Sequence, residues 1–420
     1  MGQIKTLSTE SLILEASRCV ACGLCLPQCP TYLKTQSEAD SPRGRLMLMK
    51  GVLEQRIPIN ERFIAHIDGC LTCRACENVC PNHVSYEPIV NSMRAIISPT
   101  RNSLINRIGR FMMSQLIAKP YRLEWLHGLL RFYQISGLQR LLRQCSFLNY
   151  FKIGRIEKYL PIIPLHKGWR REYSPERENR GSVGLFLGCV ARLFDIETVK
   201  SAIFVLNRLG YTVVLPENQT CCGALHLHSG YSQDVDKLAL QNVSAFEKIK
   251  VDAIISTASG CGTTLAEYQS GKNERVFSTK VQDISTFLVN VDWSEVRLNS
   301  LSAKVVIQDP CTLRNVTKKF DAPYRLLKKI PGINVEPLRN NHICCGAAGT
   351  YFLTQSDMSQ KLMLDKINDI QKAAPLFVAT SNVGCAMHLR VGLQEIGSNI
   401  EVLHPVTLIA RQMGFNHSNH

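Results

Sequence analysis

Apolar and polar positions along the C-terminal half of the chain follow two repeating sets of short elements. Apolar runs typical of buried strands occur six times, at residues 183–187, 211–215, 253–257, 305–307, 333–338 and 376–380. Residues 198–209 and 235–249, which lie between strands of the first set, have the 3.6-residue apolar period of helices. Strands that alternate with helices predict parallel α/β layers.

The pattern changes between residues 101 and 171, where apolar residues recur at helical spacing. They form three groups: Ile105, Ile108 and Met112, then Leu123, Leu126 and Leu130, then Leu138, Leu141 and Leu142. The same segment has fourteen Lys or Arg against Glu124 and Glu157, so it contributes a net twelve of the chain's +15 charges. We therefore expect two or three basic amphipathic helices. Such helices lie on an anionic membrane surface, dock on an acidic subunit, or pack on a neighbouring domain with solvated basic faces.

The composition limits the class of protein. The chain has 420 residues, 45% of them hydrophobic, which is enough for two or three globular domains. Its 17 cysteines do not indicate a secreted disulfide framework, because the first twenty residues lack the continuous apolar core of a signal peptide. No run reaches the roughly 18 apolar residues of a membrane span, and no nucleic-acid module accompanies the positive charge. We expect a cytoplasmic protein whose cysteines are reduced, metallated or catalytic.

Eight cysteines near the N-terminus form two copies of the motif C-x2-C-x2-C-x3-C-P. The copies are Cys19, Cys22, Cys25, Cys29 with Pro30, and Cys70, Cys73, Cys76, Cys80 with Pro81. In bacterial ferredoxins such a run gives three thiolates to one [4Fe-4S] cluster and its fourth cysteine to the other. This pattern assigns the thiols to two sets: Cys19, Cys22, Cys25 and Cys80, and Cys70, Cys73, Cys76 and Cys29. Zinc is the alternative, but a zinc ribbon leaves the third cysteine and the proline of each run without a role.

Forty residues separate the two motifs, more than a minimal two-cluster ferredoxin needs. Ser41 and Pro42 precede an apolar run and have the residue types of an N-cap and a first helical position. We therefore expect an α-helical ferredoxin module. Four cations beside the motifs stabilise anionic clusters, face an acidic partner or are simply solvated: Arg43, Arg45, Lys50 and Arg74.

Eight more cysteines form two copies of a second pattern. The copies are Cys189, Cys221-Cys222-Gly223 and Cys261, then Cys311, Cys344-Cys345-Gly346 and Cys385. Equivalent cysteines lie 122 to 124 residues apart, which indicates an internal duplication. Each group follows a predicted strand, and in open α/β sheets the binding crevice lies at the carboxyl ends of the strands. Each Cys-Cys-Gly is expected in a turn, because adjacent residues of a strand point to opposite faces.

We expect each copy to gather four thiols at this edge. Such thiols bind zinc or a further iron-sulfur centre, or perform thiol-disulfide chemistry. Buried free cysteines would hardly recur in two copies. The remaining cysteine, Cys145, is outside both patterns and is expected to be a small buried apolar residue.

With these motifs the chain resembles the family of glycolate oxidase iron-sulfur subunits, which join a two-cluster ferredoxin module to two cysteine-rich CCG domains. The matching segments are residues 19–32, 40–46, 70–81, 221–226, 309–313 and 382–385. The architecture is also similar to that of heterodisulfide reductase subunits, the anchoring subunit of anaerobic glycerol-3-phosphate dehydrogenase and lactate-utilisation proteins. The Asp-Ser-Pro-Arg-Gly-Arg segment at 40–45 favours the glycolate oxidase branch.

The resemblance implies a multi-domain α+β and α/β fold. Its four parts are an α-helical ferredoxin domain over 1–98, a basic helical connector over 99–180, and CCG domains over 181–298 and 299–420. It also implies two [4Fe-4S] clusters that relay electrons from an FAD-dependent partner, which oxidises glycolate to glyoxylate, toward a membrane quinone. The flavin belongs to the partner, because this chain has no G-x-G-x-x-G motif. The implied location is the cytoplasm, or the periphery of the inner face of the cell membrane.

One departure affects the C-terminal half. In heterodisulfide reductases the CCG motif ends in C-x2-C, whereas here Ala258 and Asn382 stand three residues before Cys261 and Cys385. Each copy is one thiolate short, so a catalytic thiol-disulfide reductase is the alternative rather than the first hypothesis. A subunit of a lactate or glycerol-3-phosphate dehydrogenase is another. Four histidines near the cysteines are expected to be structural rather than metal ligands or quinone contacts: His226, His228, His342 and His388.

Overall fold

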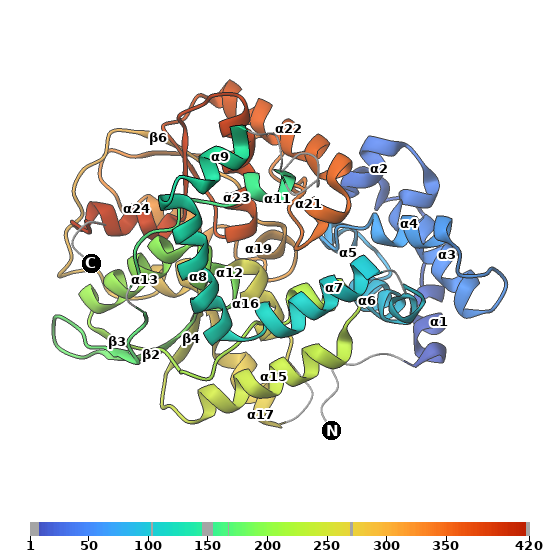
Figure 1. Ribbon diagram of the computed structural model, residues 1–420, viewed down its shortest axis with the longest axis horizontal. Coiled ribbons are helices and arrows are strands. Elements are labelled where there is room, and N and C mark those ends of the chain that lie inside the picture. Colours follow the sequence, from blue (N-terminus) through green and yellow to red (C-terminus); the bar gives the residue numbers. More distant parts are fainter. Residues whose placement is uncertain (1–7, 102–103, 145–153, 167, 269–271, 417–420) are drawn as a thin grey trace.

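The computed structural model describes residues 8–101, 104–144, 154–166, 168–268 and 272–416, so Cys145 lies outside the described residues. A helical N-terminal module, a group of connecting helices and two parallel sheets follow one another along the chain (Figure 1). This order confirms the expected fold class, a mixed fold with a helical ferredoxin module, a helical connector and a duplicated α/β half.

The N-terminal module packs short helices around one apolar core. Its elements are α1 (Thr9–Ser17), η1 (Leu26–Gln28), α2 (Pro30–Thr35), η2 (Glu38–Asp40), α3 (Pro42–Leu53), α4 (Glu61–Asp68), α5 (Ala75–Asn78), α6 (Tyr86–Ile97) and η3 (Ser98–Thr100). Met49, Ile67 and Ile89 are fully buried at the centre of this core. Helix α3 begins as predicted, because the Ser41 hydroxyl accepts a hydrogen bond from the Gly44 amide at 2.9 Å and Pro42 is the first helical residue.

The connector is helical, but its apolar faces are only partly covered. Its elements are α7 (Leu104–Met112), the π-helical η4 (Met113–Ile117), α8 (Pro120–Ile135), α9 (Leu138–Gln144) and α11 (Gly154–Lys158). Leu123 of α8 is buried, whereas Ile108 of α7 and Leu141 of α9 are 53% and 55% exposed. Packing on a neighbouring domain therefore accounts for one face of α8 but leaves other apolar side chains of α7, α8 and α9 uncovered. Among the described residues, no helix combines the length and the apolar character needed to cross a membrane.

The first cysteine-rich copy contains a five-stranded sheet in the order β1-β3-β2-β4-β5. The strands are β1 (Glu172–Tyr173), β2 (Gly181–Phe186), β3 (Tyr211–Val214), β4 (Ala253–Ser256) and β5 (Val281–Asp283). All pairs are parallel except β1 with β3, an edge pairing that the sequence pattern does not reveal. The helices are α12 (Val190–Phe194), α13 (Ile196–Arg208), α14 (Ala224–His228), α15 (Ser232–Glu247), α16 (Ser259–Ala266), α17 (Lys272–Lys280) and α18 (Ile284–Val289).

The second copy repeats this topology in a four-stranded parallel sheet, ordered β7-β6-β8-β9. Its strands are β6 (Lys304–Ile307), β7 (Asn334–Pro337), β8 (Phe377–Ala379) and β9 (Glu401–Leu403). Its helices are α19 (Cys311–Asn315), α20 (Ala322–Leu327), α21 (Tyr351–Thr354), α22 (Ser356–Ala373), α23 (Val383–Glu395) and α24 (Pro405–Gln412). The strand order of the two sheets matches position by position, as duplication requires.

Equivalent helices join the two copies. Helix α13 precedes β3 and α20 precedes the corresponding β7, and α18 and α24 follow the last strand of their copy. Helix α13 packs on α24 and α18 packs on α20, so the two copies meet across a pseudo-two-fold axis. Leu206, Leu326 and Ile409 belong to the single core that spans this interface.

Candidate functional site

The thiols of the first predicted ligand set line one cavity of the helical module. Cys19, Cys22 and Cys25 belong to the loop between α1 and η1, and Cys80 follows α5. Burial raises the pKa of the Cys25 thiol to about 11, so this thiol is neutral at pH 7 in the absence of a metal. Its use as a thiolate ligand therefore couples deprotonation to metal binding. We call these four residues the first ferredoxin set.

The second ferredoxin set, made of Cys29, Cys70, Cys73 and Cys76, lines an adjacent cavity. The two cavities share Cys76 as a lining residue. Cys29 precedes α2 and so lies beside the thiols of the other motif rather than those of its own. Cys80, the fourth cysteine of the second motif, correspondingly lies among the thiols of the first motif. The structure thus brings together the two groupings of cysteines that the ferredoxin motif predicts.

The two cysteine loops share an unusual backbone conformation. Ala21 and Gly23 have φ values of 55° and 84°, and the equivalent Thr72 and Arg74 have 51° and 59°. A left-handed conformation is unfavourable for a non-glycine residue, and most of all for a β-branched one such as Thr72. Such strain persists where the surrounding structure imposes it, and it is concentrated at ligand-binding and active sites. The Thr72 amide thereby donates a hydrogen bond to the Cys70 sulfur at 3.4 Å.

The donor set of each cavity fits an iron-sulfur cluster. Among the described residues, no three His, Cys, Asp or Glu side chains lie close enough together to hold one metal ion. A [4Fe-4S] cube binds its four thiolates through four different iron atoms, so it spaces the ligand sulfurs more widely than a single zinc ion does. Four soft thiols around each cavity provide this arrangement.

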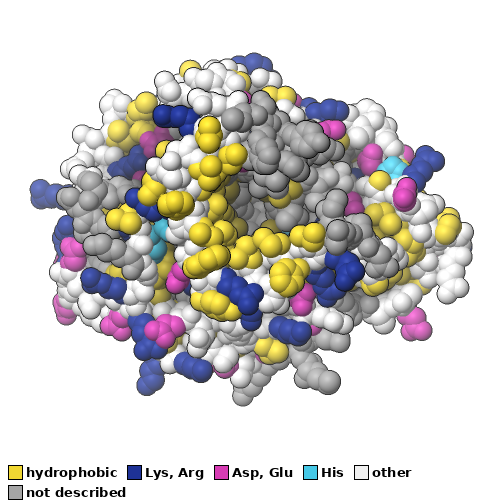
Figure 2. All heavy atoms as spheres, viewed as in Figure 1, with side chains coloured by type: hydrophobic (Ala, Val, Ile, Leu, Met, Phe, Trp, Pro, Cys, Tyr) yellow, Lys and Arg dark blue, Asp and Glu magenta, His cyan; other side chains and the backbone are white. Residues whose placement is uncertain are grey.

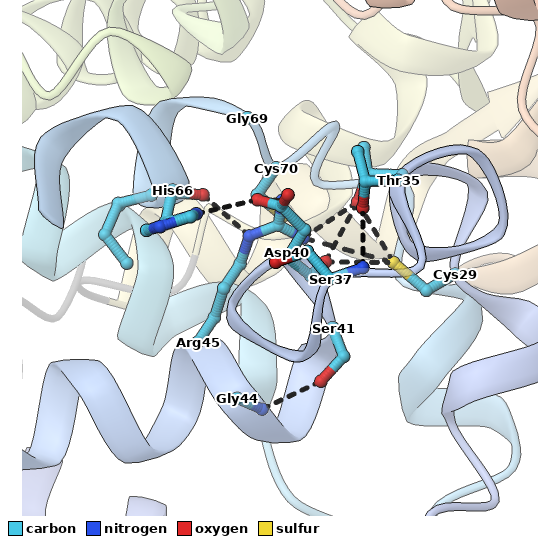
Figure 3. Close-up of polar contacts among 12 residues, drawn as sticks. Cys29, Thr35, Ser37, Asp40, Ser41, Gly44, Arg45, His66, Gly69 and Cys70 are labelled. Carbon is cyan, nitrogen blue, oxygen red and sulfur yellow. Dashed lines mark hydrogen bonds and ion pairs between the residues drawn. The ribbon is translucent and has the colours of Figure 1, made fainter. Parts of the chain in front are cut away.

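A buried arginine lies beside the second ferredoxin set (Figure 3). The Arg45 side chain is 1% exposed and donates hydrogen bonds to the His66 carbonyl oxygen at 2.7 Å and the Thr31 hydroxyl at 2.9 Å. One of its terminal nitrogens is 4.0 Å from the Cys29 sulfur. Asp40 contacts the same guanidinium at 3.4 Å and the His66 ring at 2.9 Å. Arg45 therefore places a permanent positive charge next to the Cys29 sulfur.

The second ferredoxin set faces both cysteine-rich copies. The Asn315 side chain at the end of α19 donates to the Cys73 carbonyl oxygen at 2.7 Å. The Tyr351 hydroxyl of α21 donates to the Gly69 carbonyl oxygen at 3.0 Å. Arg74 forms an ion pair with Glu267 of the first copy. The cysteine loop at 70–76 is thus held against the C-terminal half by contacts from both copies.

The second copy gathers its four cysteines beside this loop. We call them the second quartet: Cys311, Cys344, Cys345 and Cys385. The Cys345 and Cys385 sulfurs are 3.1 Å apart. The neighbouring Cys344 thiol and burial raise the pKa of Cys311, and the neighbouring Cys345 thiol and burial raise the pKa of Cys344. Burial together with the nearby Cys311 thiol raises the pKa of Cys73. The second quartet and the second ferredoxin set are therefore electrostatic neighbours.

The first copy gathers the corresponding first quartet: Cys189, Cys221, Cys222 and Cys261. The Cys189 and Cys221 sulfurs are 3.4 Å apart, and the neighbouring Cys261 thiol and burial raise the pKa of Cys222. Leu123, Leu126 and Leu130 of α8 pack in the same apolar cluster as Cys189 and Cys221. The apolar face predicted for this helix therefore packs beside two cysteines of the first quartet.

The expected Cys-Cys-Gly turns are present. Gly223 and Gly346 have φ values of 90° and 92°, which side chains other than glycine rarely adopt. A Cβ atom on Gly223 would come within 2.9 Å of Val235, and one on Gly346 within 2.8 Å of the Ser359 carbonyl oxygen. Both turns consequently require glycine on two grounds, backbone conformation and space.

The two positions that lack the fifth cysteine have structural roles. Asn382 caps α23, because its side-chain oxygen accepts a hydrogen bond from the Gly384 amide at 3.0 Å. Ala258 is buried at the start of α16, where its carbonyl oxygen accepts a hydrogen bond from Ser256 at 3.0 Å. Neither position supplies a metal ligand.

The four histidines near the cysteines differ in environment. His388 is buried between the Tyr159 hydroxyl at 2.9 Å and the Ser359 hydroxyl at 3.2 Å, and burial lowers its pKa to about 4. Burial also lowers the pKa of His228 to about 4. His226 is fully buried, whereas His342 is exposed. The satisfied contacts of His388 fit the expected structural role.

Asn315, Tyr351 and Arg94 were not among the residues that the sequence singles out. Arg94 supports the second cysteine loop, since its guanidinium donates hydrogen bonds to the Cys70 carbonyl oxygen at 2.6 Å and the Thr72 hydroxyl at 2.9 Å. Asn315 carries a weak signal, because it lies one helical turn after Cys311 and so shares a helix face with it. Tyr351 and Arg94 carry none, since their contacts join segments far apart in the sequence.

Three described families match this chain. Residues 15–84 match the 4Fe-4S dicluster domain, and residues 183–266 and 305–390 each match the cysteine-rich domain called CCG. Residues 106–160 match the linker region of the glycolate oxidase iron-sulfur subunit. These matches coincide with the helical module, the duplicated half and the connector.

Similar proteins cover nearly the whole chain. A probable glycolate oxidase iron-sulfur subunit of Bacillus subtilis is 33% identical over 95% of this chain and 94% of its own length. The glycolate oxidase iron-sulfur subunit of Escherichia coli is 30% identical over 92% of this chain and 91% of its own. The lactate utilization protein A of Halalkalibacterium halodurans is 28% identical over 55% of this chain and 97% of its own.

Proposed function

Because the chain belongs to the family of glycolate oxidase iron-sulfur subunits, we propose that it relays electrons from a flavoprotein that oxidises glycolate to glyoxylate toward a membrane quinone. An iron-sulfur electron-transfer role within an oxidoreductase complex follows from the family. The substrate, the flavin-bearing partner and the quinone are the proposed parts. The proposed location is cytoplasmic, on the inner face of the cell membrane.

The arrangement of the ferredoxin thiols supports this proposal most directly. Each set combines three cysteines of one motif with one of the other; the first set lines its cavity together with the shared Cys76, and the second set lines the adjacent cavity. When bound there, two [4Fe-4S] clusters would supply carriers of single electrons, which a flavin that has taken up two electrons needs. The first set would hold one cluster and the second set the other. The shared lining residue Cys76 means that the two clusters would lie next to each other.

The contacts of the 70–76 loop indicate where electrons leave the helical module. Cys73 is the ferredoxin cysteine whose pKa responds to a thiol of the C-terminal half, Cys311. The two quartets also approach each other, since the Thr312 hydroxyl next to Cys311 donates to the Ser259 hydroxyl two residues before Cys261 at 2.9 Å. We propose that the quartets bind an iron-sulfur centre, or zinc if their sulfurs move closer together than they lie in this structure, because soft thiols suit both.

Removing one thiol from each ferredoxin set tests the relay. Cys22→Ala and Cys73→Ala, each made in the intact complex, should each lower the iron content by about four atoms per chain. Glycolate oxidation coupled to a quinone analogue should be lost in both variants, while reduction of an artificial dye at the flavin persists. Cys145→Ala is the matched control, because Cys145 lies outside every cysteine motif. Normal coupling to quinone in both ferredoxin variants would contradict the relay.

A further inference from the structure

A separate cavity lies between the connector and the first cysteine-rich copy. Its volume is about 260 Å³, which is close to the lower end of the size range of small-molecule sites. Its lining residues are Leu123, Glu124, His127, His166, Gly168, Trp169, Arg192 and Leu193. Helix α8 supplies one wall and α12 the other, and these two helices pack against each other (Figure 1).

Four buried nitrogen atoms in this wall lack hydrogen-bond partners among the residues that the structure describes: His127 Nε2, His166 Nε2, Trp169 Nε1 and Arg192 Nε. The Arg192 side chain is only 7% exposed. Buried polar atoms in folded proteins are nearly always paired, so four unpaired nitrogens around one cavity indicate a bound polar molecule. Its groups must accept hydrogen bonds, because the indole and guanidinium nitrogens can only donate them.

The charge of the cavity favours an uncharged ligand. Arg192 is already paired with Glu124, at 3.5 Å. Burial lowers the pKa of His166 to about 4 and also lowers that of His127, so both rings are neutral at pH 7. A neutral imidazole nitrogen either donates or accepts a hydrogen bond, depending on its tautomer. Such nitrogens can donate to a carbonyl oxygen of an oxidised ligand or accept from the hydroxyl that replaces it when the ligand is reduced.

The rings in the wall favour a flat ligand. The His166 and Trp169 rings lie 4.2 Å apart between centroids, and the His127 ring meets the His166 ring edge-on at 6.2 Å. Leu123 and Leu193 provide the apolar part of the lining. Flat aromatic ligands gain from offset stacking and edge contacts of this kind.

The cavity borders an apolar surface, which we call the connector patch. Its exposed members are Ile108, Phe111, Met112, Tyr121, Trp125, Leu129, Phe132, Ile135, Leu138, Leu141, Ile162 and Leu165. Yellow side chains gather along α7, α8 and α9 in Figure 2, with basic residues beside them. Trp125 and Leu165 adjoin the lining residues Glu124 and His166 in the sequence. An apolar surface rimmed by positive charge is typical of proteins that lie on anionic lipid.

The cavity also adjoins the first quartet. Cys189 directly precedes α12, which carries Arg192 and Leu193. Leu123 and Leu193 line the cavity and also pack with Cys189 and Cys221. A molecule in the cavity is therefore separated from the quartet by one layer of side chains.

We propose that this cavity binds the headgroup of a membrane quinone. The two carbonyl oxygens accept hydrogen bonds from Trp169 and Arg192 or the imidazoles, the flat ring packs against His166 and Trp169, and the apolar tail leaves along the connector patch. The identity of the acceptor rests on the proposed function, whereas the presence of a site for a neutral acceptor of hydrogen bonds rests on the cavity itself.

Equilibrium dialysis of the full, cluster-loaded chain with decylubiquinone tests the site without turnover. The ring of this quinone is fully substituted, so it does not alkylate free thiols. Trp169→Phe keeps the aromatic ring and removes the N–H, and should weaken binding about tenfold, which corresponds to about 1.4 kcal/mol. Trp293→Phe is the matched control, because the Trp293 Nε1 donates to the Leu288 carbonyl oxygen at 2.8 Å elsewhere in the fold. Iron content and helicity verify that each variant is folded, and His127→Phe serves as a second variant.

Each other outcome overturns the proposal. Equal affinity in Trp169→Phe, Trp293→Phe and the unchanged chain would place the quinone elsewhere. Binding of acetate or phosphate that depends on Trp169, without quinone binding, would identify an anion site. Absence of binding by all three probes would leave a water-filled cavity. The relay is tested independently, because Cys22→Ala should abolish coupling to quinone while leaving decylubiquinone affinity unchanged.

Discussion

The Asn315 side chain donates a hydrogen bond to the carbonyl oxygen of Cys73, at a nitrogen to oxygen distance of 2.7 Å. This contact joins a cysteine of the helical module to the helix that begins at Cys311, 238 residues further along the chain. The Asn78 side chain donates to Asn315 at 2.9 Å, so one amide group holds two segments of the module. The position of the second ferredoxin set relative to the second quartet depends on this amide.

Replacing Asn315 with Ala should loosen the junction. The change removes both hydrogen bonds, and each is worth about 1 kcal/mol. We expect the thermal midpoint, followed by cluster absorbance, to fall by about 2 to 4 °C for each kcal/mol lost. Asn290→Ala is the control, since the exposed Asn290 side chain bonds only to its own helix, at the Thr286 carbonyl oxygen. Equal midpoints for the two variants would show that the amide does not hold the junction.

Replacing Arg45 with Gln should lower the midpoint potential of the cluster held by the second ferredoxin set. Reduction adds negative charge, which the buried guanidinium beside Cys29 stabilises. Loss of this cation also leaves the partly exposed Asp40 with the His66 ring as a remaining contact. A redox titration followed by electron paramagnetic resonance measures the effect. Arg56→Gln, on the exposed surface of the same module, should leave both potentials unchanged, and an unaltered potential in Arg45→Gln would exclude an electrostatic role.

Replacing His404 with Asn should reduce the loss of stability in acid. Burial lowers the pKa of His404 to about 3, whereas a histidine in the unfolded chain has a pKa near 6.5. The unfolded state therefore binds more protons, and stability is full above pH 6.5 and falls as pH decreases toward 3. At pH 5 this residue costs on the order of 2 kcal/mol.

Asparagine retains the role of His404 as the N-cap of α24, where the histidine accepts a hydrogen bond from the Val406 amide at 3.0 Å. Thermal midpoints at pH 7.5 and 5.0 measure the slope. The variant should lose less stability between these values than the unchanged chain. Identical slopes would mean that His404 is not among the groups that take up protons on acid unfolding.

Replacing Trp125 and Phe132 together with Ser should weaken binding to lipid vesicles. Both side chains belong to the connector patch and are 69% and 64% exposed. The unchanged protein should float with anionic vesicles at low salt and less at high salt, because screening weakens the basic contribution. Leu240→Ser removes an exposed apolar residue of α15 and should have no effect. Equal flotation of the double variant and this control would show that the patch does not contact lipid.

Much of the architecture was predictable because its signals are local. Six strand-like runs correspond to β2, β3, β4, β6, β7 and β8, and the two helices predicted at 198–209 and 235–249 correspond to α13 and α15. The edge strands β1, β5 and β9 are too short to produce a pattern. For the connector, helical periodicity was right, but periodicity alone does not say whether an apolar face finds a partner. The side chain of Leu123 is buried against a partner, whereas that of Ile108 is exposed.

Some features of the candidate site were likewise predictable from the sequence, and others were not. The sequence by itself determined the two ferredoxin motifs, the Cys-Cys-Gly turns and the duplication, because thiol spacing and glycine conformation are properties of short segments. Only the tertiary structure decided that Arg45 lies against Cys29, that Asn315 meets Cys73, and that unpaired nitrogens of α8, of α12 and of the segment that contains His166 and Trp169 surround one cavity. These relationships join residues far apart in the chain, and they arise from burial and packing between elements, which no local pattern records.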